Sequence, residues 1–165
     1  MQFSVCINGE TEEQLISRSK IMLGNFLESN NIDIHTLPKI KVIKFTGQSS
    51  LGQNNQSWHI DDVSLINFVI NVNGEGTDFF NEDTQQIESL GEGNGIFLIG
   101  EQGQAFFGLK STIHKAPIVV SDSRIILKLI IDGSDKIEGY NSSLYYERLR
   151  EANKHLEEFL SKNNL

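Results

Sequence analysis

The chain has 165 residues, of which 38% are hydrophobic and 22% are charged, a composition typical of a globular protein with a packed core. Its formal net charge is −8, its pI is about 4.9, and it has no lysine- and arginine-rich run, which argues against nucleic-acid binding. Cys6 is the only cysteine, and the sequence has neither a signal-peptide pattern nor an apolar run of membrane length, so we expect a cytoplasmic protein without disulfides.

Two helices are expected at the ends of the chain. Residues 3–7 form a short apolar run that indicates a strand, and Thr11 and Gln14 then fit a capping box. Apolar residues at helical spacing predict a first helix over about 11–29 and a second over about 143–162. The first stripe consists of Leu15, Ser19, Met22, Leu23, Phe26 and Leu27.

The middle of the chain has the pattern of short β-strands. In the long run 63–72 the even positions from Ile66 to Val72 are apolar, whereas the odd positions include Asn67 and Asn71, so one face of this strand is dry and the other is partly polar. A hairpin is expected at 100–103. The other predicted strands cover residues 40–46, 77–80, 95–99, 104–107, 112–115 and 124–131.

About seven or eight short strands with glycine-rich turns predict a mainly β sandwich or barrel, and the eight-stranded form of this architecture is the jelly roll. No linker or internal repeat divides the sequence. We therefore expect a single domain over 1–165, with a β core at about 40–132 and the two helices flanking it.

A polar segment at 47–57 precedes the most informative motif of the chain. Two interpretations stay open for it, a lid over a substrate and a plain surface loop.

The motif itself is Trp58-His59-Ile60-Asp61-Asp62. Residues two apart on a strand point to the same side, so the side chains of His59 and Asp61 can bind one ion, whereas Asp62 points away. His114, in a later predicted strand, supplies a third ligand. Two imidazoles and one carboxylate form the facial triad of non-haem Fe(II) oxygenases, which leaves coordination positions open for substrates.

The order His59-x-Asp61, then His114, then Arg124 ten residues later resembles the Fe(II)/2-oxoglutarate-dependent dioxygenase superfamily. The surrounding sequence is also similar, in Trp-His-x-Asp-x-Val-x-Leu at 58–65, in Gly-Thr-x-Phe at 76–79 and in His-Lys-Ala-Pro at 114–117. The resemblance covers roughly residues 57–132 and favours a small bacterial-type member.

This resemblance implies a double-stranded β-helix of the jelly-roll type and two cofactors, Fe(II) and 2-oxoglutarate. His59, Asp61 and His114 would be the metal ligands and catalytic residues, and Arg124 would bind the far carboxylate of 2-oxoglutarate, which its planar guanidinium suits. The implied reaction couples oxidative decarboxylation of 2-oxoglutarate, to succinate and CO₂, with hydroxylation of a substrate. Halogenating relatives lack the triad carboxylate, so Asp61 favours hydroxylation.

The sequence also departs from the family pattern. Ile126 stands where many members have a serine or threonine that shares the carboxylate with the arginine, so a second contact has to come from elsewhere. Asn67 is our preferred candidate, ahead of Asn71. Lys128 has the same strand parity as Arg124 and could add positive charge beside it, although we favour a solvated residue at a strand end.

Substrate and assembly stay open at this stage. A small metabolite, an amino acid or a protein side chain, together with O₂, fits the acidic chain, whereas nucleic acid and membrane do not, and a monomer or a homodimer is expected. The alternatives are a cupin-like metal enzyme or binding protein that does not use 2-oxoglutarate, and a non-catalytic β-sandwich module. His35 and His155 have no partner at ligand spacing and are expected to be exposed.

Overall fold

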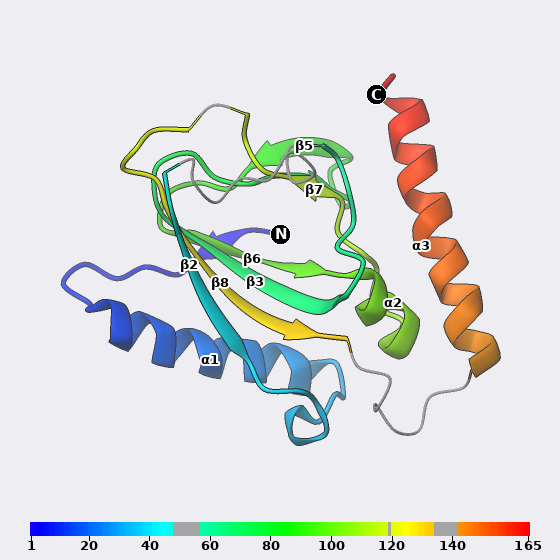
Figure 1. Cartoon of the computed structure of the whole chain (residues 1–165), viewed down its shortest axis with the longest axis horizontal. Coiled ribbons are helices and arrows are strands. Elements are labelled where there is room, and N and C mark those ends of the chain that lie inside the picture. The colour runs from blue at the N-terminus through cyan, green and yellow to red at the C-terminus, as the bar shows by residue number, and fades with distance from the viewer. Residues whose placement is uncertain (48–56, 119, 134–141) are drawn as a thin grey trace.

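The computed structural model describes residues 1–47, 57–118, 120–133 and 142–165. In this part of the chain, two antiparallel sheets form the centre of the molecule (Figure 1). The larger sheet has the strand order β1-β6-β3-β8-β2 and the smaller one the order β5-β4-β7. The larger sheet consists of β1 (Phe3–Ser4), β2 (Lys41–Thr46), β3 (Ser64–Asn73), β6 (Asn94–Ile99) and β8 (Ile125–Asp132). The smaller sheet consists of β4 (Asp78–Asn81), β5 (Gln86–Ser89) and β7 (His114–Lys115).

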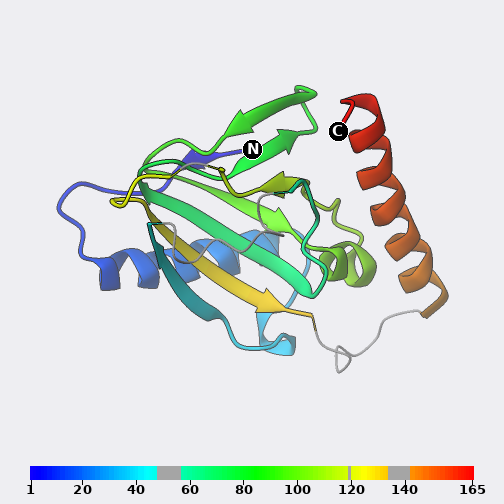
Figure 2. The same cartoon turned by 45° about the horizontal axis from the view of Figure 1, so that its top comes forward.

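Helices accompany the sheets. Within the described ranges they are α1 (Glu12–Ser29), the short 3₁₀ helix η1 (Ile34–Thr36), α2 (Glu101–Phe107) and α3 (Ser142–Lys162). Helix α1 lies across the outer face of the larger sheet, and α3 stands at one side of the molecule beside α2 (Figures 1 and 2). Among the described residues, none of the helices combines the length and the apolar character that crossing a bilayer requires.

The start of α1 follows the predicted capping box. The amide of Gln14 donates to Thr11 Oγ1 at 3.1 Å, and the Gln14 side chain accepts from the Thr11 amide at 3.0 Å. These two bonds satisfy amides that a helix start otherwise leaves unpaired. The predicted apolar stripe then packs Leu23 and Leu27 against the larger sheet, so α1 seals the outer face of that sheet.

Alternation along β8 separates two apolar layers. Leu127, Leu129 and Ile131 pack in the layer beneath α1, whereas Ile126 belongs to a second cluster between the two sheets. That inner cluster contains Val69, Phe79, Leu90, Ile96, Leu98 and Ile126. Because successive side chains on a strand point to opposite faces, the even-numbered residues of β8 face the space between the sheets.

The prediction of a strand over 104–107, with a hairpin at 100–103, is wrong. This segment forms α2, with Gly100 as its N-cap residue. A short apolar run such as Ala-Phe-Phe fits a strand or a buried helix equally well. The glycines serve close packing rather than a hairpin turn, since a β-carbon on Gly103 would lie 2.2 Å from the carbonyl oxygen of Leu65.

Other strand boundaries also differ from expectation. The predicted strand at 3–7 is reduced to β1, and the one at 112–115 is reduced to β7. Strand β5 is absent from the prediction, because its polar sequence reflects an exposed position at the edge of the smaller sheet. The mainly antiparallel architecture and both flanking helices are confirmed. The polar segment 47–57 lies, except for its two ends, outside the described residues.

Gly100 provides a test of the packing between α2 and β3. A β-carbon at this position would lie 2.0 Å from the carbonyl oxygen of Ser64, so we expect Gly100→Ala to lower the free energy of unfolding by about 1–3 kcal/mol. In α1, a β-carbon on Gly24 meets only Ile34 Cδ1 at 3.8 Å, so Gly24→Ala should stabilise the protein by up to about 1 kcal/mol. Urea unfolding measures the free energy of unfolding of both variants. If this free energy changed in the same direction in the two variants, the result would contradict this packing.

Candidate metal centre

The candidate site is built on a backbone pairing between His59 and His114. The amide of each residue donates to the carbonyl oxygen of the other at 3.0 Å, which makes an isolated antiparallel bridge next to β7. The two imidazole rings lie on the same side of this bridge, with centroids 4.4 Å apart. Two histidines from distant parts of the chain are therefore fixed side by side by main-chain bonds.

Asp61 completes the group. Its Oδ1 lies 3.4 Å from Nε2 of His59 and 3.2 Å from Nε2 of His114. One ligand atom of each residue falls within 4.8 Å of the others, so the three could hold a single metal ion. The structure thus brings together all three residues predicted as metal ligands.

The outer nitrogens of both histidines are already engaged. Nδ1 of His59 lies 2.6 Å from the carbonyl oxygen of Ser57, and Nδ1 of His114 lies 2.9 Å from that of Thr112. A carbonyl oxygen only accepts, so each Nδ1 carries a proton. Each Nε2 then faces Asp61, where it donates to the carboxylate when the ring is charged and offers a lone pair to an ion when the ring is neutral. Backbone carbonyls fix metal-binding histidines in this tautomer and orientation in known metal sites.

The electrostatics of Asp61 also fit a cation. Burial on its own would raise the pKa of the Asp61 carboxyl, but the charge and hydrogen bonds of His114 and His59 outweigh burial and hold this pKa well below its usual range. For His59, burial favours the neutral ring, yet the Asp61 carboxylate and the Ser57 carbonyl raise its pKa overall. Oδ2 of Asp61 is buried and has no hydrogen-bond partner among the described residues, which suits a carboxylate that coordinates a metal.

Neighbouring residues hold the motif from both sides. The amide at the start of α2, from Glu101, donates to the Asp61 carbonyl oxygen at 2.8 Å. On the opposite face of the motif, Trp58 packs edge-on against Phe159 of α3, with ring centroids 5.2 Å apart, and Ile60 joins the same cluster. Trp58 is therefore a packing residue, and α2 and α3 support the segment that carries His59 and Asp61.

Arg124 lies at the start of β8 and is only 3% exposed. Its Nε donates to the carbonyl oxygen of Glu75 at 2.8 Å. Burial lowers the pKa of Arg124, and the carboxylate of Glu75 partly opposes this shift. The bond from Nε anchors the guanidinium to the main chain, and the two terminal nitrogens carry the remaining N–H donors, in the forked geometry that suits a carboxylate.

Asn67 is buried on the inner face of β3, opposite Ile130 of β8. Its Oδ1 has no hydrogen-bond partner in the described part of the chain. Asn71, the less preferred alternative, is different, because its Nδ2 donates to the carbonyl oxygens of Gly74 and Leu90 at 2.9 Å each. The amide nitrogen of Asn71 is thus occupied in holding the turn after β3, although its Oδ1, like that of Asn67, has no partner among the described residues.

The expectation that Lys128 is a solvated strand end is wrong. Lys128 lies in the middle of β8, opposite Val69 of β3 and Ile43 of β2, and it shares the inner parity of Ile126. It is partly buried, with its ammonium 4.9 Å from the centroid of the Phe45 ring. Burial lowers the pKa of Lys128. The charge of Asp61 raises this pKa in part, and the charge of Arg124 lowers it further. In the sequence, the parity that Lys128 shares with Arg124 is the feature that indicates its place on the inner face of β8.

The remaining histidines lie outside the site. His35 is exposed, as expected. His155 is not exposed: its ring is half-buried and its Nε2 contacts the carboxylate of Glu82, which also pairs with Lys110 at 3.2 Å. No local pattern indicates this contact, because α3 and the turn after β4 meet only in the folded chain.

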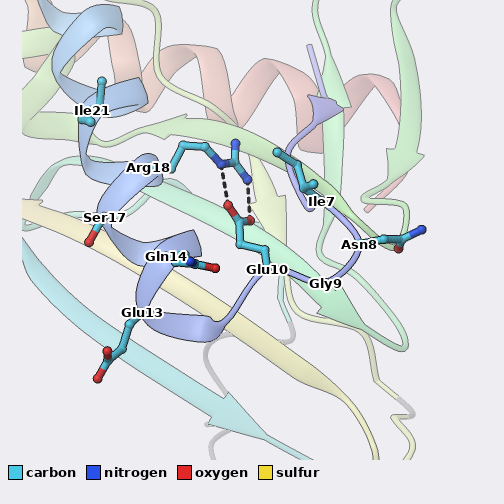
Figure 3. Close-up of a pocket in the computed structure, with 9 residues that line it drawn as sticks. All are labelled: Ile7, Asn8, Gly9, Glu10, Glu13, Gln14, Ser17, Arg18 and Ile21. Atoms are coloured by element: carbon cyan, nitrogen blue, oxygen red, sulfur yellow. Dashed lines mark hydrogen bonds and ion pairs between the residues drawn. The ribbon is translucent and has the colours of Figure 1, made fainter.

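A surface hollow of about 780 Å³ lies beside the first turns of α1, away from the three ligands (Figure 3). Its central feature is an ion pair in which Arg18 donates to both carboxylate oxygens of Glu10, at 2.7 and 2.8 Å. The Arg18–Glu10 pair satisfies both charges, so this hollow has no chemistry comparable to that of the histidine–aspartate group.

No protein-family model matches the sequence, and no curated protein matches it either. Solved structures do match. A rice dioxygenase for auxin oxidation superimposes with a TM-score of 0.53 at 15% identity, over 86% of this chain and 57% of that chain, so this chain spans little more than half the length of that enzyme. The fold of this chain is therefore similar to that of a dioxygenase, in agreement with the resemblance seen in the sequence.

Two further matches are weaker in shape and add no argument of their own. The viral collagen prolyl hydroxylase of Paramecium bursaria Chlorella virus-1, solved with 2-oxoglutarate, has a TM-score of 0.42 at 16% identity, over 81% of this chain and 79% of that chain. A full-length Neurospora crassa protein, solved with α-ketoglutarate, has a TM-score of 0.40 at 13% identity, over 90% of this chain and 64% of that chain.

The pKa shift of His59 predicts a pH dependence in the metal-free protein. A histidine whose pKa is raised in the folded state contributes stability that is complete below its unfolded pKa of about 6.5 and is lost as the pH rises through the folded pKa. Asp61→Asn removes the carboxylate that contributes most to raising this pKa. His59 becomes charged as the pH falls from about 8 to about 5. Over this range we expect the free energy of unfolding of Asp61→Asn to drop progressively below that of the wild type.

Urea unfolding with a chelator present measures this difference, and Asp62→Asn is the matched control, since Asp62 is exposed. Parallel stability profiles for the wild type and Asp61→Asn would contradict the charge coupling between Asp61 and His59.

Proposed function

We propose that this chain is an Fe(II)/2-oxoglutarate-dependent oxygenase that hydroxylates a small metabolite, an amino acid or a protein side chain. The observation that carries the proposal is the convergence of His59, Asp61 and His114, with both Nε2 atoms and a buried carboxylate oxygen available to one ion. Two imidazoles and one carboxylate are the ligand set of non-haem Fe(II) oxygenases.

The strand order supports a jelly roll. The chain passes repeatedly between the two sheets, with β4 and β5 following each other in the smaller one. Strands β2, β3, β6 and β8 lie in the larger sheet, while His59, β4, β5 and β7 lie in or beside the smaller one. This arrangement is the one expected for an eight-stranded jelly roll, and we propose it for a single domain over 1–165. The metal group then lies between the sheets, with His114 buried and His59 and Asp61 partly exposed.

In this proposal each residue has a definite task. His59, Asp61 and His114 bind the iron, and the Ser57 and Thr112 carbonyls orient the two histidine rings. Arg124 and Asn67, on the inner faces of β8 and β3, bind 2-oxoglutarate. Bound iron and 2-oxoglutarate would together supply O₂ activation, with succinate and CO₂ as co-products. The buried surroundings orient the reactants and limit access of water.

Anaerobic titration with Fe(II) and then with 2-oxoglutarate tests the proposal. A weak visible metal-to-ligand charge-transfer band should appear when both are bound, and release of succinate over a panel of metabolites should follow in air. A folded protein that binds iron but gives no band with 2-oxoglutarate would favour a cupin-like protein, and one that binds no iron would favour a non-catalytic module.

His114→Ala should weaken Fe(II) binding by at least about a hundredfold, because it removes one of three ligands, whereas loss of a group that merely supports a ligand costs about ten- to a hundredfold. Calorimetric titration of the anaerobic protein measures this loss. His35→Ala is the matched control, since His35 is exposed and outside the site. Circular dichroism has to show that both variants remain folded. Equal Fe(II) affinity in the two variants would contradict the assignment of His114.

A further inference from the structure

Lys128 is a cation inside the candidate site that the proposed ligand set does not use. Its ammonium makes no hydrogen bond or ion pair with any of the described residues, and it lies 4.9 Å from the centroid of the Phe45 ring. An ammonium has three donor hydrogens, and its partial removal from water is unfavourable when they find no acceptor. A partly buried ammonium without a protein acceptor is available to a bound anion.

The position of Lys128 defines the chemistry of that ligand. It shares the inner face of β8 with Arg124, whose charge disfavours the charged form of Lys128. The Asp61 carboxylate also acts on Lys128, and Lys128 in turn acts on His59. The ammonium therefore lies within electrostatic range of both the metal ligands and Arg124.

Positive charge is in excess here. Arg124 and Lys128 face inward from one strand, and a divalent metal on His59, Asp61 and His114 would add to them, while Asp61 is the only carboxylate in the ligand group. An acid with two carboxylates, one at the metal and one beyond it, would offset most of this excess positive charge. This conclusion rests on the proposed function, in which 2-oxoglutarate is that acid.

We propose that Lys128 binds the far carboxylate of 2-oxoglutarate together with Arg124, and so takes the place of the serine or threonine that Ile126 replaces. Ile126 packs in the apolar cluster between the sheets and offers no donor. Lys128 is the next residue of β8 with the same parity, and its long side chain brings a charged donor to a carboxylate that the Arg124 guanidinium also contacts. The two cations hold the carboxylate from positions four residues apart, on either side of Ile126.

Binding to matched oxoacids tests this assignment. The anaerobic Fe(II) protein is titrated with 2-oxoglutarate and with 2-oxobutanoate, which keeps the metal-chelating end but lacks the far carboxylate, and the charge-transfer band reports the affinity. Lys128→Met should weaken binding of 2-oxoglutarate by about ten- to a hundredfold, the range for loss of a charge-assisted hydrogen bond. The same change should leave 2-oxobutanoate binding unaltered, and Lys128→Arg should restore most of the affinity for 2-oxoglutarate.

Lys44→Met is the matched control. Lys44 lies on the neighbouring strand β2 with its side chain 42% exposed and paired with Glu12, so its loss should change neither affinity. Thermal melting of the metal-free proteins gives a second measurement: Lys128→Met should match or exceed the wild-type melting temperature, because it removes a desolvated ammonium without an acceptor. A strongly destabilised Lys128→Met protein would contradict the inference, because it would mean that the fold itself uses the ammonium.

The outcomes separate this inference from the proposed function. If the iron-loaded wild type gives no saturable response to 2-oxoglutarate, the proposed function fails and the assignment of Lys128 fails with it. If the wild type responds and Lys128→Met binds 2-oxoglutarate equally well, the inference alone is overturned. The same holds if Lys128→Met keeps that affinity but loses turnover, since Lys128 would then contact a substrate instead.

Discussion

The reciprocal pair of hydrogen bonds between His59 and His114 is the constraint on which the site depends. Side chains alone would place two distant imidazoles only loosely, because each has rotamer freedom to lose. A main-chain bridge fixes both α-carbons, and the Ser57 and Thr112 carbonyls then fix both rings. Asp61 needs no separate anchor, since its position two residues after His59 places it on the same face, and the amide of Glu101 holds its carbonyl oxygen.

The same alternation that positions Asp61 divides the whole larger sheet into a structural and a chemical face. Toward α1 the residues of β3 and β8 are apolar and fully packed, as Phe68 and Leu129 show with no measurable exposure. Toward the smaller sheet, polar groups are interspersed among Val69 and Ile126. The outer face carries the stability of the fold, which leaves the inner face free to keep groups that are unfavourable without a ligand.

Much of this arrangement could be predicted from the sequence. The capping box at Thr11 and the helical stripes indicate α1 and α3, and the period of two indicates β3 and β8, because these patterns are local. The spacing of His59 and Asp61 places them on a shared face. The pairing of His59 with His114 needed the resemblance to a family, since no local pattern specifies a bridge between distant segments. Helix α2 could not be predicted because a short apolar run has no distinctive period.

For Lys128, the residue type predicts a solvated side chain, whereas its position in the strand predicts an inward one. A lysine in a strand is most often solvated, and that general tendency led to the wrong environment. Its parity with Arg124 and Ile126 already placed it on the inner face, and the flanking Leu127 and Leu129 are turned toward α1. Asp61 Oδ2 is a buried acceptor without a partner in the described part of the chain, and the Lys128 ammonium is a donor without an acceptor there. In the proposed function, a metal ion satisfies the first group and the far carboxylate of 2-oxoglutarate satisfies the second.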